Sequence, residues 1–179
     1  MKALEHLRTI NHHKWLVMKH CFKVGLYKQG LLHDMSKYTP TEFLVGCRYY
    51  QGNRSPNNAE REVPAIPRPG STTRAGISTT MNTGWITVWI PEKIVGQKMP
   101  IRYAVEMFMD RVAASKTYMG DRYTVSHPLK YYEQGAEKLG KMIHPETAAL
   151  LRHLLEMLAE KGEEETFRYI RKEILKNKK

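Results

Sequence analysis

The sequence has no long apolar run and very little cysteine. None of its 179 residues belongs to a stretch that approaches the roughly 18 to 20 consecutive apolar residues of a membrane-spanning helix. The N-terminal stretch MKALEHLRTINHHK is charged throughout and has no apolar signal core. Cys21 and Cys47 are the only cysteines and lack CxxC spacing, which predicts reduced core thiols. These absences predict a cytoplasmic protein without a membrane segment.

Acidic residues are also in the minority. The chain has 18 Asp and Glu against 29 Lys and Arg, for a formal net charge of +11. Such an excess attracts anionic partners, among them nucleotides, nucleic acids and acidic surfaces, but charge alone does not identify one. With 41% hydrophobic residues, the length fits one domain, residues 1–179, that is large enough to bury a core.

One internal block is depleted in most residue types. Between Val63 and Ile90 there is no Asp, Glu, Lys, His, Leu, Phe or Tyr, whereas there are three prolines, three glycines and six threonines. The block has no helical period, and only its last part, Trp85 to Ile90, has strand-like residues. A structureless segment of this length is uncommon inside a compact domain and requires an explanation.

Outside that block, apolar residues recur at helical spacing. At the start of one helix, Thr39, Pro40 and Glu42 form a capping-box pattern with proline at the first helical position. We expect an all-α fold with a long irregular insert at about 63–98. The pattern predicts helices over about 3–26, 40–50, 100–118, 129–142, 145–161 and 164–175.

The sharpest local feature is the adjacent pair His33-Asp34. Imidazole and carboxylate together suit a divalent transition metal. Neighbouring side chains diverge on a regular helix, so a shared ion requires a helix end or bend, which Gly30 before the pair and the capping pattern after it allow. Such a pair also occurs by chance in proteins without a metal, so the dipeptide alone does not establish a site.

Three further residues have two interpretations each. His13 and His20 share one face of the first helix, where a histidine is more often a hydrogen-bonded core residue than a ligand. Asp110 interrupts an otherwise apolar face of the helix at 100–118. A carboxylate facing the interior costs several kcal/mol unless it is paired or bound to metal, so Asp110 requires either a basic neighbour or an ion.

The order of these residues resembles a known superfamily. The chain resembles the HD superfamily of metal-dependent phosphohydrolases in the order His13, then His33-Asp34, then Asp110 within MDRVAA. The segment GLLHDMSKY, which includes Lys37, resembles the metal-binding segment of that superfamily. Residues 1–62 and 98–118 resemble more closely a small, uncharacterised family of bacterial and phage proteins within that superfamily. The resemblance implies an HD-domain-like helical bundle, with His13, His33, Asp34 and Asp110 as ligands of a divalent ion such as Mn, Fe, Zn or Mg.

The resemblance also implies an activity. It assigns catalytic roles to Asp34 and Lys37, in a hydrolase that acts on a small anionic substrate, a phosphomonoester or a nucleotide. Lys37 either contacts the phosphate or forms an ion pair with Asp34. The alternative is a non-catalytic basic helical binding protein, with nucleic acid as a candidate partner, which the basic tail RKEILKNKK supports.

The depleted block departs from the resembled family. In the superfamily, additional histidines between the HD pair and the final Asp hold a second metal or contact phosphate. In this place the resembled family has a histidine-rich tract of the form AWLHHKGRNKHHYEYW. Permissible codons for residues 63–88, read from the third base of the first codon, encode TGYSTAWLHHKGRNKHHYEYWMDYS, and the unique codons of Met81 and Trp85 are compatible. We therefore hypothesise that Val63 to Ile90 is translated out of frame, with the proper frame resuming by about Lys98. A natural Thr- and Pro-rich loop is the alternative, and the nucleotide sequence of the locus decides between them.

Overall fold

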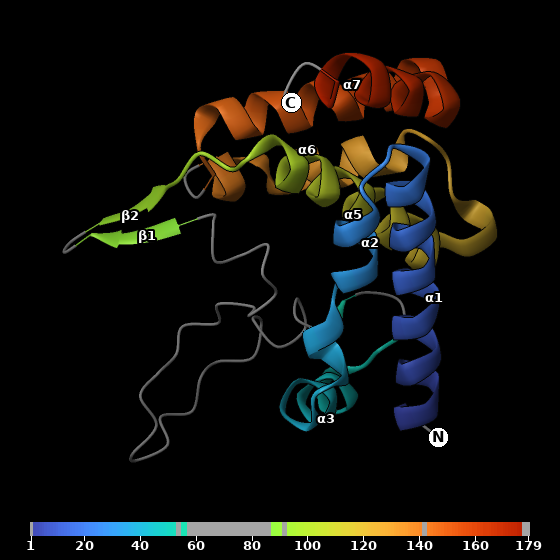
Figure 1. Ribbon diagram of the computed structural model, residues 1–179. Helices are drawn as coiled ribbons and strands as arrows, with labels where there is room; N and C mark the ends of the chain where they lie inside the picture. Colours follow the sequence, from blue (N-terminus) through green and yellow to red (C-terminus); the bar gives the residue numbers. More distant parts are fainter. Residues whose placement is uncertain (1, 53–54, 57–86, 91–92, 141–142, 177–179) are drawn as a thin grey trace.

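A computed structural model describes residues 2–52, 55–56, 87–90, 93–140 and 143–176 (Figure 1). The fold is all-α, as predicted, with one added two-stranded hairpin. Among the described residues, no helix combines the length and apolarity needed to cross a membrane. Both cysteines are free thiols, with Cys21 buried and Cys47 half-buried.

The helix predicted over 3–26 is present but ends three residues early, and a short second helix that the sequence did not predict follows it. Helix α1 (Lys2–Lys23) ends before Gly25, whose positive φ of 85° breaks the helix. Helix α2 (Tyr27–Leu32) then turns back against α1. Gly30 permits the close approach, because a Cβ at this position would lie 3.0 Å from the Cβ of Cys21. The short helix η1 (Met35–Tyr38) follows.

Helix α3 (Pro40–Tyr49) begins at the predicted proline and lies near the N-terminal end of α1 (Figure 1). The predicted capping box is wrong. The Thr39 hydroxyl donates to the carbonyl of Ser36 at 2.7 Å and makes no cap of α3. The Glu42 carboxylate accepts from the Ser36 hydroxyl at 3.2 Å. Both side chains therefore stabilise the preceding turn, because η1 ends directly beside the start of α3.

Helix α5 (Ile101–Met119) forms the centre of the core and packs against α1, α6 and α7. One apolar stripe of α5 is buried, with Val105, Phe108 and Val112 fully inaccessible to solvent. Buried leucines of α7, among them Leu151 and Leu155, complete the core around it. Helix α5 is central because it packs against α6 and α7 and also against α1 and α2.

The C-terminal helices follow the prediction with one refinement. The short turn η2 (Gly120–Arg122) leads to helix α6 (His127–Gly140). Helix α7 (Pro145–Tyr169) is interrupted at Gly162, whose φ of 77° and ψ of −179° are not helical. The break expected between the helices at 145–161 and 164–175 is thus a kink. The π-helical turn η3 (Ile170–Ile174) ends the described helix.

The hairpin consists of β1 (Thr87–Ile90) and β2 (Lys93–Gly96), which pair antiparallel with Thr87 opposite Gly96. The strand-like residues predicted over Trp85–Ile90 are confirmed for Thr87–Ile90. Residues 63–86, which make up most of the hypothesised out-of-frame segment and of the insert at about 63–98, lie outside the described residues.

Candidate metal centre

The chain bends sharply between α2 and η1, and the bend carries His33 and Asp34. His33 has an extended backbone (φ −55°, ψ 132°) and Asp34 a left-handed one (φ 55°, ψ 22°). Asp34 is alone among the described non-glycine residues in having a positive φ, a conformation that is uncommon outside glycine and is found at functional sites. The bend turns the two side chains together, with His33 Nε2 3.5 Å from Asp34 Oδ2.

Helix α5 supplies two carboxylates to His33. The ring nitrogen Nδ1 of His33 shares a hydrogen bond of 2.9 Å with Glu106 Oε1, and Nε2 lies 3.4 Å from Asp110 Oδ1. Because Nδ1 is engaged by Glu106, Nε2 is the nitrogen that faces Asp34 and Asp110. This buried Nε2 has no hydrogen-bond partner of suitable geometry among the described residues.

Helix α1 supplies His13. Its Nε2 lies 2.9 Å from Asp110 Oδ1 and 3.7 Å from Asp34 Oδ2. One candidate ligand atom from each of His13, His33 and Asp34 lies within 4.8 Å of the other two, so these three buried residues could hold a metal ion. The Asp110 side chain is 38% exposed, so the cluster reaches the surface on this side. Residues from α1, the α2–η1 bend and α5 thus converge on one point.

Lys37 lies beside the cluster and forms an ion pair with Asp34, with Nζ 2.6 Å from Oδ2. The ion pair is one of the two alternatives that the sequence left open. Burial lowers the pKa of Lys37, but the charges of Asp34 and Asp110 outweigh burial and raise it. Lys37 therefore remains a cation next to the carboxylates.

Opposing effects also set the pKa values of the cluster. Burial alone lowers the pKa of His33, but the carboxylates of Asp110, Glu106 and Asp34 together raise it to about 10. Burial alone raises the pKa of Asp110, whereas the neighbouring His13 and His33 imidazoles hold it well below its usual value. The clustered carboxylates thus strongly favour a positive charge at this point. Either a protonated histidine or a bound cation supplies that charge.

Two other histidines of α1 lie away from the cluster. His6 is buried and lies against Phe43 and Tyr50, with ring centroids 5.6 and 5.2 Å apart. His20 is buried against Phe167, 5.4 Å between ring centroids, so its core interpretation holds. The structure brings together the five site residues that the resemblance implies, His13, His33, Asp34, Asp110 and Lys37, and leaves out His20.

The sequence reasoning missed Glu106. Its signal was available, because an acidic residue four positions before Asp110 lies on the same side of a helix. Lys14 was also missed. It lies 5.3 Å from the centroid of the Tyr38 ring, and although burial lowers its pKa, the charge of Asp34 opposes that shift. Lys14 and Lys37 thus provide positive charge near Asp34 from two elements.

Comparison with known proteins gives one match. A family model described as "Family of unknown function (DUF5662)" matches residues 2–157. No curated protein and no solved structure matches the chain. The match spans α1 to α5, which carry the cluster, as well as α6 and part of α7.

Proposed function

We propose that this chain, which belongs to the DUF5662 family of unknown function, is a metal-dependent phosphohydrolase-like protein. In this proposal His13, His33, Asp34 and Asp110 hold one divalent ion, and the substrate is a phosphomonoester or a nucleotide. The order of these residues along the chain also resembles the HD superfamily of phosphohydrolases, which is consistent with the proposed activity.

The observation that carries the proposal is the environment of His33. A histidine that binds metal through one ring nitrogen commonly donates the other N–H to a carboxylate, which fixes the ring orientation. Glu106 is placed to accept from Nδ1, and it leaves Nε2 buried, without a hydrogen-bond partner among the described residues, and facing two carboxylates. This donor set of two imidazoles and two carboxylates fits Mn²⁺, Fe²⁺ or Zn²⁺, and its oxygens also fit Mg²⁺.

A bound ion of this kind supplies a water of lowered pKa and polarises a phosphoryl oxygen. The remaining roles fall to the chain itself. Glu106 orients His33, and Asp34 holds Lys37 beside the cluster at 2.6 Å. Lys37 and Lys14 provide positive charge that would attract and position a phosphate group.

The test is phosphate release by the purified chain after loading with each of the four ions in turn. Suitable substrates are p-nitrophenyl phosphate and nucleoside monophosphates. We expect the His33→Ala, Asp34→Ala double variant to lose metal and to lose activity by about a hundredfold or more. His12→Ala is the matched control, because His12 is exposed and adjacent to His13. Equal phosphate release by the double variant would show that the activity arises elsewhere.

A second candidate function is a non-catalytic basic helical binding protein. The lack of the histidine-rich tract and the net charge of +11 favour it. Metal binding without phosphate release from any of these substrates supports this second candidate over the hydrolase.

A further inference from the structure

The last turn of α7, η3, the end of α1 and the start of α5 together form a basic surface. Two adjoining hollows, of about 360 and 570 Å³, mark it, and both are lined by Arg171 and Lys172. We call this surface the basic stripe. Its six cationic residues are Lys23, Arg102, Arg168, Arg171, Lys172 and Lys176.

Acidic residues are few in the lining of the basic stripe. Glu164 is the single acidic residue among those that line the two hollows. Arg168 forms an ion pair with Glu165, but within the described part of the chain the other five cations have no ion pair. All six side chains are exposed. Cations gathered in this way repel one another, and an anionic ligand would relieve that repulsion.

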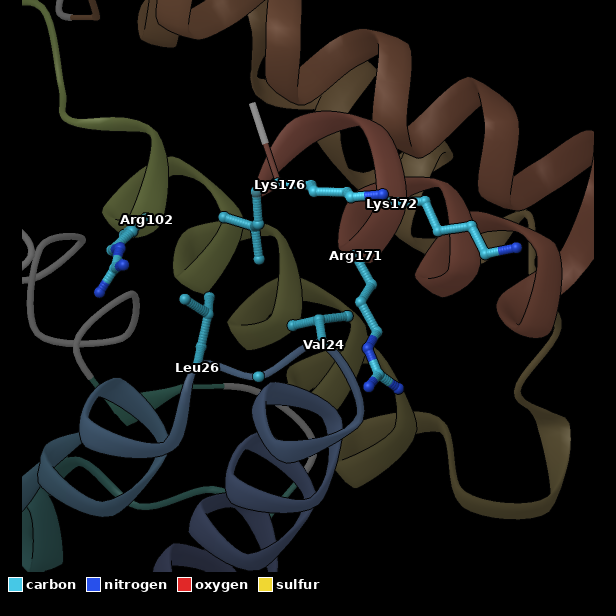
Figure 2. Close-up of a pocket in the computed structure, with 8 residues that line it drawn as sticks. Val24, Leu26, Arg102, Arg171, Lys172 and Lys176 are labelled. Carbon is cyan, nitrogen blue, oxygen red and sulfur yellow. The ribbon is translucent and has the colours of Figure 1, made fainter. Parts of the chain in front are cut away.

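The arrangement of the cations indicates an extended ligand. Figure 2 shows Arg102 on one side of the first hollow and Arg171 and Lys172 on the other, with their charged ends pointing apart. A compact anion such as a single phosphate requires donors that converge on one point, which these do not. Between them lie the apolar side chains of Val24 and Leu26. The π-helical turn η3, a rare element that is frequent at functional sites, carries Arg171 and Lys172.

An aromatic pair stands next to the basic stripe in the sequence. Phe22 and Tyr27 are 37% and 60% exposed and pack edge to face, with ring centroids 5.2 Å apart. Phe22 precedes Lys23, and Tyr27 follows Leu26 of the first hollow. Exposed aromatic rings near a row of cations are the combination that binds single-stranded nucleic acid, through base stacking and phosphate contacts.

We propose that the basic stripe binds single-stranded nucleic acid. The cations contact successive phosphates of the backbone, and Tyr27 offers a ring on which a base stacks. The proposal does not depend on the metal centre, because none of these residues contributes to that cluster.

The test is fluorescence anisotropy with a labelled 20-nucleotide single-stranded oligonucleotide of mixed sequence, measured over a range of KCl concentrations. Five unpaired cations predict a slope of log Kd against log salt concentration of about 3 to 4. The Arg171→Glu, Lys172→Glu double variant is expected to weaken binding about tenfold or more and to lower the slope by about 1 to 2. Tyr27→Ala is expected to weaken binding with little change in slope.

The matched control is the Lys2→Glu, Arg8→Glu double variant, which changes the net charge equally. Both residues are exposed on α1, and Arg8 lies about 22 Å along the helix from Lys23. This variant should keep most of the affinity. Equal loss in both double variants contradicts the proposal, as does tighter binding to a duplex of the same length. Binding to vesicles of anionic lipid without binding to the oligonucleotide also overturns it. Circular dichroism confirms that each variant is folded.

Discussion

The hydrogen bond between Glu106 and His33 decides which ring nitrogen faces the rest of the cluster. The bond is 2.9 Å long and both residues are buried. A glutamine at position 106 keeps an oxygen that can accept from Nδ1 but removes the negative charge that makes the imidazole a better ligand. We expect Glu106→Gln to lower metal affinity about 10- to 100-fold. Competition with a fluorescent chelator measures the affinity.

The control for that prediction is Glu5→Gln, because Glu5 is exposed in the first turn of α1. It should bind metal like the unmodified chain. If Glu106→Gln also retained the full affinity, Glu106 would be a structural partner of His33 without influence on the ion.

His20 gives the stability of the protein a pH dependence that is separate from the cluster. Burial, with a smaller contribution from Lys116, lowers its pKa from 6.5 to about 4. The folded state therefore keeps His20 neutral at a pH where the unfolded chain protonates it. Above pH 6.5 His20 is neutral in both states and does not affect stability. As the pH falls toward about 4 the unfolded state alone gains a proton, so the free energy of unfolding decreases by up to about 3 kcal/mol.

Urea unfolding at several pH values tests this assignment. In His20→Gln the free energy of unfolding should be lower at pH 7 and should fall less between pH 6.5 and 4 than in the unmodified chain. His12→Gln, at an exposed position of the same helix, should leave the pH profile unchanged. A His20→Gln profile parallel to that of the unmodified chain would contradict the buried neutral histidine.

The histidines of α1 show where residue-level prediction reaches its limit. His6, His13 and His20 recur every seven residues and are all buried, so helical spacing puts them on one face. Their neighbours differ: aromatic rings for His6, carboxylates for His13, and Phe167 with Lys116 for His20. Those neighbours come from distant parts of the chain. The residue pattern by itself therefore did not single out His13 as a metal ligand; the resemblance to the HD superfamily did. Neither of them predicted Glu106.

At the scale of the element, α7 depends on the backbone of Gly162. Its φ of 77° and ψ of −179° lie in a region that is essentially restricted to glycine, whereas an added Cβ would contact nothing within 4 Å. Gly162→Ala should therefore destabilise the protein by about 1 to 3 kcal/mol through the backbone alone. Chemical denaturation measures the change in the free energy of unfolding.

Gly135 provides the matched control within α6. It is helical, and a Cβ at this position also meets nothing within 4 Å. Gly135→Ala should stabilise the protein by about 0.5 to 1 kcal/mol, because alanine loses less backbone entropy in a helix. The two substitutions are thus expected to have opposite signs. A stabilising effect at Gly162 would show that α7 is not kinked in solution.

Element boundaries were predicted best where one residue decides them. Pro40 fixes the start of α3, and Gly25 fixes the end of α1, although the sequence placed that end a few residues later. The capping box was wrong because Thr39 and Glu42 each had a second hydrogen-bonding partner in Ser36. A local pattern cannot show such competition, since both arrangements use the same short stretch of chain.

At the scale of the whole molecule, the segment from 63 to 90 is the part whose sequence departs most from the resembled family. If it is translated out of frame, a chain that carries the alternative-frame tract gains four histidines. We expect that chain to hydrolyse phosphomonoesters about tenfold faster or more than the chain as written. Phosphate release under identical metal loading measures the difference. Equal rates would favour a natural loop, and a shuffled tract of the same composition is the control.

The central claim is that α1, the α2–η1 bend and α5 together form one metal centre, and metal stoichiometry tests it most directly. The chain is stripped with a chelator, reloaded with Mn²⁺, Fe²⁺ or Zn²⁺ and desalted, and bound metal is measured by inductively coupled plasma mass spectrometry. We predict about one ion per chain for the unmodified protein and for His12→Ala, and a loss of most of that ion in His13→Ala and Asp110→Ala. No bound ion in the unmodified chain, or equal binding in His13→Ala and His12→Ala, would contradict the account.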